Sequence, residues 1–203
     1  TDNNEIYHNT GGLLIFNLPH LTVYGEDIRA YNNHIYDNNL KNFGVKGSIV
    51  STVPRGSGVI IMATKKVTLY ENKIENHKTV NSSIVSYKIY VPPKNKKKKK
   101  KKKKKALPNG VRYLENDYES DTQYSAFPGE IFIYNNQFKN KHWFPALDND
   151  FGKLWVLKNG MKIPDIAYDA ILPEDYYIQG QQINPEYKVC IKNNGAINFA
   201  ALD

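Results

Sequence analysis

The sequence contains little cysteine, little arginine and no long apolar run. Its single cysteine, Cys190, excludes an intramolecular disulfide. No apolar segment approaches the roughly 20 residues that a transmembrane helix requires. The five histidines include no pair at i, i+4 and no neighbouring cysteine, so the sequence does not indicate a zinc site.

Positive charge is concentrated in one segment of the chain. The formal net charge is +8, but the run of lysines at 96–105 supplies more than this whole excess. The rest of the chain carries interspersed charges of both signs and is slightly acidic. A nucleic-acid-binding domain is therefore excluded, because it would need basic residues distributed over a folded surface.

Asparagine and tyrosine are abundant, with 24 and 15 residues, and they recur in one phrase. This eight-residue phrase occurs at residues 28–35, 67–74 and 131–138, with partial copies at both ends of the chain. It consists of an apolar residue, a spacer, a second apolar residue, Tyr, a spacer, Asn, a spacer and finally Ile or Phe. The alternation places each apolar pair on one face of a strand. The Asn then falls at a bend, where its tolerance of positive φ is useful.

Stacked copies of this phrase would align Asn33, Asn72 and Asn136 in a ladder of amide hydrogen bonds. The pattern predicts an all-β fold, a right-handed parallel β-helix in which each coil buries its apolar face only by stacking. The spacing between copies is irregular, which leaves a β-sandwich with Asn-rich hairpins as the alternative.

Long loop insertions account for the irregular spacing in a β-helix. We expect coils over residues 1–142, interrupted by a loop insertion at 92–123 that contains the lysines 96–105. The lysines are expected to form a disordered loop or to stand for residues of undetermined identity; the alternative is an electrostatic anchor to acidic polymer or lipid. Residues 143–203 are expected to form a C-terminal capping segment over the open end, followed by a last coil.

Several phrases resemble one known group. Residues 12–19 (GLLIFNLP), 51–58 (STVPRGSG), 84–87 (IVSY) and 163–166 (IPDI) are similar to bacterial exported parallel β-helix repeat proteins, which share their architecture with pectate lyases. The resemblance spans nearly the whole chain apart from the lysine insertion, and departs at Ala170, where Gly is expected. It implies the C-terminal fragment of a larger protein, exported to the periplasm, cell surface or medium, with a lipid anchor upstream as one option. It implies no reaction.

Aromatic residues are the first candidates for ligand binding. Tyr31, Tyr70 and Tyr134 share one position of the phrase and would form a stripe on stacked coils. An outward stripe could stack against sugar rings, whereas an inward one would only line the core. His142 and Trp143 follow a coil in a loop, where recognition residues are common.

Candidate metal ligands occur at one place. Asp148 and Asp150 flank Asn149 and could supply oxygen ligands to Ca²⁺; the alternative is an Asx-rich turn. Apart from Ca²⁺ at this position, no cofactor is expected.

The sequence favours a non-catalytic surface or carbohydrate-associated binding scaffold. One alternative is a polysaccharide lyase or epimerase acting on acidic polysaccharide, which would need a Lys or Arg base near carboxylates. The three arginines, Arg29, Arg55 and Arg112, show no such cluster along the sequence, so this fragment is not expected to hold a complete lyase site. The other alternative is an interaction module for a second exported protein. The expected partners are a polysaccharide or such a protein, and not nucleic acid.

Overall fold

The computed structural model describes residues 1–45, 48–90, 118–179 and 181–202. Its strands, in chain order, are β1 (Glu5–Tyr7), β2 (Gly11–Phe16), β3 (Glu26–Tyr31), β4 (His34–Tyr36), β5 (Ser57–Met62), β6 (Lys65–Tyr70), β7 (Lys73–Glu75), β8 (Val80–Val85), β9 (Gly129–Tyr134), β10 (Gln137–Lys139), β11 (Ile166–Tyr168), β12 (Tyr177–Ile178), β13 (Gln182–Ile183), β14 (Val189–Lys192) and β15 (Phe199–Ala201). Its helices are the α-helix α1 (Asp150–Asn159) and the 3₁₀ helices η1 (Ile49–Thr52), η2 (Tyr87–Tyr90), η3 (Tyr118–Ser120) and η4 (Pro185–Tyr187).

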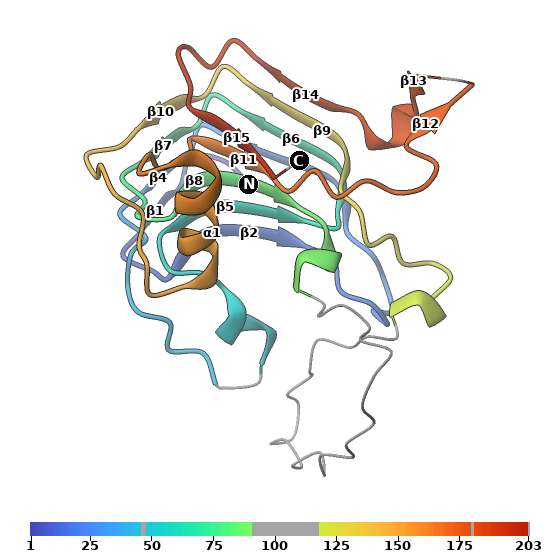
Figure 1. The fold of residues 1–203 in the computed structure, drawn as a ribbon, viewed down its shortest axis with the longest axis horizontal. Coiled ribbons are helices and arrows are strands. Elements are labelled where there is room, and N and C mark those ends of the chain that lie inside the picture. The colour runs from blue at the N-terminus through green and yellow to red at the C-terminus, as the bar shows by residue number, and fades with distance from the viewer. Residues whose placement is uncertain (46–47, 91–117, 180, 203) are drawn as a thin grey trace.

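Nearly all strands belong to three parallel sheets that the chain visits in rotation. Sheet A contains β3, β6, β9 and β14; sheet B contains β1, β4, β7 and β10; sheet C contains β2, β5, β8, β11 and β15. Neighbours in each sheet are parallel and separated along the chain by one circuit of the other two sheets, as Figure 1 shows. The fold is the predicted parallel β-helix, and the β-sandwich alternative is wrong because, among the described strands, only β12 and β13 pair antiparallel.

The repeated phrase sets the register of sheet A. Val67 pairs with Ile28 on one side and Ile131 on the other, and all three point into the solenoid. Matching positions on sheets B and C add residues such as Ile35 and Ile61, so the inner core is a stack of aliphatic side chains. Alternation within each strand is what keeps this stack inside.

The bend from sheet A to sheet B carries the predicted Asn ladder. The Oδ1 atom of Asn72 accepts hydrogen bonds from the backbone N and Nδ2 of Asn33, at 3.1 and 2.9 Å. The backbone N and the Nδ2 of Asn72 in turn each donate a hydrogen bond to Asn136 Oδ1, both at 3.0 Å. The ladder continues to Asn4 at one end and Asn194 at the other. These shared oxygens satisfy buried backbone and side-chain donors together.

The backbone strain of this bend lies one residue earlier than expected. Positive φ occurs at Asn32, Glu71, Asn135 and Asn193, each directly before a ladder residue. The expectation that the ladder Asn itself adopts positive φ is therefore wrong. The ladder position selects Asn for its two-sided amide, and the preceding position selects a residue that tolerates the left-handed region.

The outer face of sheet C is covered by other parts of the chain. All residues of β5 and β8 are buried, because alternate side chains face the inner core and a second, outer cluster. Phe151 and Trp155 of α1 belong to this outer cluster, together with Ile60 and Met62 of β5. Figure 1 shows α1 lying beside the strands of sheet C.

The C-terminal region contributes strands to two of the parallel sheets. Strand β11 pairs with β8, β14 pairs with β9, and β15 pairs with β11, so residues after 143 extend sheets C and A. Within the predicted insertion 92–123, η3 belongs to the described part, and Tyr118 packs in the outer cluster. The lysines 96–105 lie outside the described residues.

Replacing a central ladder residue should strongly destabilise the fold. In Asn72→Ala, the buried backbone N of Asn33 loses its acceptor and the carbonyl of Ala30 loses the Nδ2 donor, which should cost about 3–4 kcal/mol because each orphaned buried group costs ~1–3 kcal/mol. Urea denaturation would measure this loss. The control Gln137→Ala removes an exposed amide and should change the free energy of unfolding by less than about 0.5 kcal/mol. Equal effects would contradict the structural role of the ladder.

Glu71 is the one member of its positive-φ row that is not Asn. Its φ is 56°, whereas Asn32, Asn135 and Asn193 occupy the equivalent positions. Glu71→Asn should therefore stabilise the protein by ~0.5–1 kcal/mol, because Asn enters the left-handed region at lower cost. The melting temperature of this variant should rise, while Thr68→Asn in the adjacent strand should show no gain. A lower melting temperature for Glu71→Asn would count against this explanation.

Candidate functional site

The three tyrosines predicted as a stripe form a stacked column beside the Asn ladder. The ring centroids of Tyr31 and Tyr70 are 4.9 Å apart and those of Tyr70 and Tyr134 are 5.4 Å apart, both with interplanar angles of 10°. Lys192 Nζ lies over the Tyr134 ring at 5.8 Å. Burial, followed by the two neighbouring phenols, raises the pKa of Tyr70. Each face of Tyr70 is therefore covered by a ring, and a sugar could reach only ring edges.

His142 and Trp143 lie away from the tyrosine column. The tyrosines precede the bend into sheet B, whereas His142 and Trp143 follow β10 at the bend out of it. Trp143 is 76% exposed, and its ring centroid lies 5.7 Å from that of Phe144. His142 is half-buried, and burial followed by Lys78 lowers its pKa. The predicted ligand-binding residues thus form two separate groups.

Asp148 and Asp150 lie at the start of α1, in a cleft of about 610 Å³. Asn149 between them is the N-cap, and its Oδ1 accepts from Gly152 N at 2.8 Å. Asp148 pairs with Arg55 at 2.9 Å and Asp150 pairs with Lys153 at 2.9 Å. Two cations beside the two carboxylates disfavour Ca²⁺ there. Across the described ranges, no three His, Cys, Asp or Glu side chains cluster to hold a metal.

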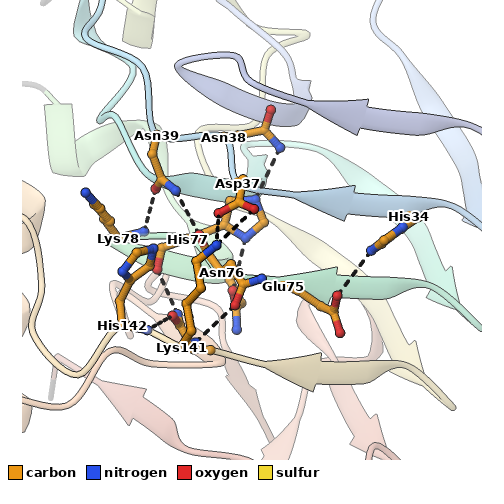
Figure 2. A network of polar contacts seen from close by, with 12 residues as sticks. His34, Asp37, Asn38, Asn39, Glu75, Asn76, His77, Lys78, Lys141 and His142 are labelled. Carbon is orange, nitrogen blue, oxygen red and sulfur yellow. Dashed lines mark hydrogen bonds and ion pairs between the residues drawn. The ribbon is translucent and has the colours of Figure 1, made fainter.

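The bend from sheet B to sheet C carries a second ladder that contains a buried histidine. Asn9 donates to Asn38 Oδ1 at 3.1 Å, and Asn38 Nδ2 lies 3.2 Å from His77 Nε2. His77 is fully buried, and its Nδ1 is 3.0 Å from Asn81 Oδ1. Figure 2 shows His77 at the centre of this network.

The hydrogen bonds assign one neutral tautomer to His77. Asn38 Oδ1 already accepts from Asn9, and Asn38 Nδ2 also donates to Ile6 O at 2.9 Å, so Nδ2 faces His77 as a donor. His77 Nε2 is therefore the acceptor, and Nδ1–H donates to Asn81. Burial lowers the pKa of His77 to about 4, against the opposing effect of the Asn81 hydrogen bond. Both ring nitrogens are used internally, so His77 has a structural role.

The residues around His77 close this bend (Figure 2). Asn39 Oδ1 accepts from Lys78 N at 2.8 Å, which ties one turn to the next. Lys141 Nζ pairs with Asp37 Oδ1 at 2.9 Å on the solvent side. The network therefore joins successive coils and leaves no opening to His77.

A second polar group lies on the outer face of sheet B. His34 Nε2 is 3.2 Å from Glu75 Oε2, and Lys73 Nζ is 3.4 Å from the same oxygen. The His34 ring stacks on Tyr36 at 4.2 Å. These residues pair across adjacent strands of a sheet face, which is an arrangement that stabilises a sheet.

Glycines explain how the second ladder fits inside the solenoid. Gly12 and Gly58 lie in adjacent strands, and a Cβ at Gly12 would collide with Asn38 Nδ2 at 2.9 Å. A Cβ at Gly58 would collide with the His77 ring at 2.7 Å. The small residues at the entry of β2 and β5 thus make room for Asn38 and His77.

The open cleft most suited to a ligand lies at the bend from sheet C to sheet A. Its volume is about 570 Å³, and it is lined by residues 118–119, 121–127 and 173–175 with Lys65, Lys88 and Tyr187. Long excursions of the chain form both walls. Gly129 allows one wall to approach β9, because any side chain there would collide with the carbonyl of Glu186 in η4.

Aromatic rings and lysines meet in this cleft. The ring centroids of Phe127 and Tyr187 are 6.3 Å apart in an edge arrangement. Lys88 Nζ lies 4.6 Å from the Phe127 centroid, and Lys65 Nζ lies 5.2 Å from that of Tyr187. Exposed cation–π contacts are worth only ~0.5–1 kcal/mol, so a ligand could displace a lysine from a ring.

Asp121 holds the neighbouring loop against the cleft wall. It accepts hydrogen bonds from the Tyr24 hydroxyl and from the backbone N of His20 and Gln123. These hydrogen bonds, with that of Tyr24 first, lower the pKa of Asp121. The carboxylate therefore stays charged at the edge of the cleft.

Sequence reasoning missed this cleft and the role of His77. The cleft residues come from two insertions that have no period, although residues 118–127 carry three aromatic rings among polar side chains. For His77, the available signal was its position, one residue after Asn76 in the series that also contains Asp37–Asn38.

Comparisons of the chain with protein-family models, with curated proteins and with solved structures find no match. Among the described helices, none has the length and apolar character to cross a membrane. Fold and site geometry are therefore the basis of the functional argument.

The stability contributed by His77 should decrease as the pH is lowered. Its pKa is lowered from 6.5 to about 4, so the unfolded chain binds the proton more readily, and about 3 kcal/mol should be lost between pH 7 and 4. Burial raises the pKa of Asp169 to about 6, which acts in the opposite direction over the same range. The comparison with His77→Asn, which keeps an amide in the ladder and also retains Asp169, isolates the histidine.

Urea denaturation from pH 7 to 4 would measure this difference. His77→Asn should gain about 3 kcal/mol relative to the native sequence as the pH falls, and the exposed His8→Asn at the same bend is the matched control substitution. Parallel pH profiles for the native protein and His77→Asn would show that His77 is not the acid-sensitive group.

Proposed function

We propose that this chain is a non-catalytic carbohydrate-binding scaffold and that the cleft beside Phe127 and Tyr187 is its binding site. The observation that carries the proposal is an open cleft of about 570 Å³ in which aromatic rings and hydrogen-bonding side chains converge. Ligand pockets commonly have volumes of ~300 to 1,000 Å³, so this cleft suits a small ligand or a few sugar units.

The chemistry of the cleft suits sugars. Pyranose rings present C–H groups that pack on aromatic faces, and hydroxyls that need donors and acceptors. Phe127 and Tyr187 supply rings, while Thr122, Gln123 and Ser125 supply hydroxyl and amide groups on the same wall. In the tyrosine column on sheet A, both faces of Tyr70 are covered by neighbouring rings and Lys192 lies over Tyr134, so the cleft is the better candidate.

The scaffold supports such a site. The cleft walls are loops held on packed parallel sheets, and binding residues commonly lie on loops positioned by a rigid framework. The resemblance of residues 12–19 and 51–58 to exported β-helix repeat proteins supports membership of that pectate-lyase-like group and a location in the periplasm, at the cell surface or outside the cell. A polysaccharide is then the natural partner.

The competing functions make different demands. A lyase would need a Lys or Arg base facing the ligand. In the cleft, Lys65 is paired with Glu186 and Lys88 lies over the Phe127 ring, while Arg29 and Arg55 lie elsewhere, on sheet A and beside Asp148. A protein partner would not depend on the Phe127 ring in a cleft. Binding and product assays can therefore separate these functions.

Phe127→Leu should weaken saccharide binding. The substitution keeps an apolar side chain but removes the ring, and ring contacts of ~0.5–1.5 kcal/mol correspond to about a two- to twelvefold loss of affinity. Calorimetry with neutral, amino-sugar and uronic-acid tetrasaccharides would measure the loss. The matched control Phe132→Leu removes a half-exposed ring from the outer face of sheet A and should leave affinity unchanged.

The same titrations include the outcomes that overturn the proposal. Absence of saccharide binding, or an equal loss in Phe127→Leu and Phe132→Leu, would rule out the cleft as a carbohydrate site. Release of unsaturated product from a uronic-acid polymer would show that the protein is a lyase and would overturn the proposal of a non-catalytic scaffold. Melting temperatures of both variants would show whether a lost affinity reflects lost folding.

A further inference from the structure

We infer that the cleft takes amino sugars, whose free amino groups are positively charged, in preference to neutral sugars, and that it disfavours uronic acids. The inference rests on the proposed function and concerns the ligand's charge. It is drawn from the carboxylates that line the cleft around the rings of Phe127 and Tyr187, which we call the aromatic floor.

Among the described residues that line the cleft, carboxylates outnumber ammonium groups. Glu119, Asp121, Glu174 and Asp175 line it, against the two ammonium groups of Lys65 and Lys88. The acidic residues come from both walls, so a ligand between the walls meets carboxylates on each side. A cationic sugar gains from this field, and an anionic one is repelled.

The lysines do little to offset this excess. Lys65 Nζ is 3.2 Å from Glu186 Oε2, so its charge is already paired beside the cleft. Lys88 is exposed and lies over the Phe127 ring. A sugar that packs on Phe127 would push the flexible Lys88 ammonium outward. The carboxylates would then be the charged groups nearest to the ligand.

The two walls supply carboxylates of different character. Asp121 is held by the Tyr24 hydroxyl and two backbone N–H groups, and only 12% of its side chain is exposed. It therefore contributes a fixed charge rather than a flexible contact. Glu174 and Asp175 on the opposite wall are exposed, and Asp175 Oδ2 is 3.4 Å from the Tyr187 hydroxyl. These two can meet an ammonium group next to the aromatic floor.

The lysines 96–105 require a specific control. They make the whole chain basic, so polyanions can bind to these lysines themselves. Binding at the cleft is therefore defined as the part that responds to substitutions in its lining. Short ligands at physiological salt limit the long-range contribution, because the Debye length is then about 8 Å.

The test compares three tetrasaccharides that differ in charge, titrated calorimetrically into the full chain. The probes are the tetramer of glucosamine, the tetramer of N-acetylglucosamine and the tetramer of galacturonic acid. We expect affinity to fall in that order. Glu174→Gln with Asp175→Asn should weaken the glucosamine tetramer about five- to tenfold and bring the neutral tetramer within about twofold of it, since one charge contact near water is worth roughly a fivefold change.

A control variant removes one carboxylate charge elsewhere on the surface. Glu5→Gln neutralises an exposed carboxylate on sheet B and should alter no affinity. A galacturonate tetramer that binds most tightly and weakens in Phe127→Leu would overturn this inference and leave the carbohydrate-binding proposal standing. Equal affinity for all three tetramers, or the same effect from Glu5→Gln as from the double variant, would also overturn it. If Phe127→Leu changes no titration, the proposed function itself fails.

Discussion

The shared amide oxygen of the Asn ladder is the contact on which the solenoid depends. Asn72 Oδ1 satisfies a backbone N–H and a side-chain amide of the coil before it, and Asn136 Oδ1 does the same for Asn72. A slip of one residue would orphan these buried groups and turn every apolar side chain of the strand outward. The ladder thus couples the position of each coil to that of the next.

Once this register is set, equivalent positions stack along the whole fold. Tyrosine falls on tyrosine in sheet A, and Gly12 falls on Gly58 where the second ladder needs space. The bend from A to B contains only two residues, such as Glu71 and Asn72, so it cannot accept long loops. Insertions are confined to the other bends, and that is why the clefts and α1 lie there.

The sequence predicted what repeats, and it could not predict what is built from distant, unrepeated segments. Asn33 and Tyr70 were identified because their neighbours along the chain repeat with them. His77 occupies the ladder position of Asn38, but a lone histidine in sequence does not reveal that both ring nitrogens meet amides from separate segments. The cleft joins residues near 121 to residues near 175, and no period links these segments. Similarly, α1 covers sheet C through contacts that local pattern does not specify.

The net charge of the chain likewise does not reveal where the charged residues lie in the fold. A net charge of +8 predicts an anionic ligand only if the positive charges face the ligand, and the lysines 96–105 account for more than the whole excess. The described part of the cleft lining has the opposite sign, with four carboxylates and two lysines, one of which is paired with Glu186. Charges farther apart than the Debye length of about 8 Å at physiological salt are largely screened, so for the sugar preference that we propose the local lining counts more than the total charge.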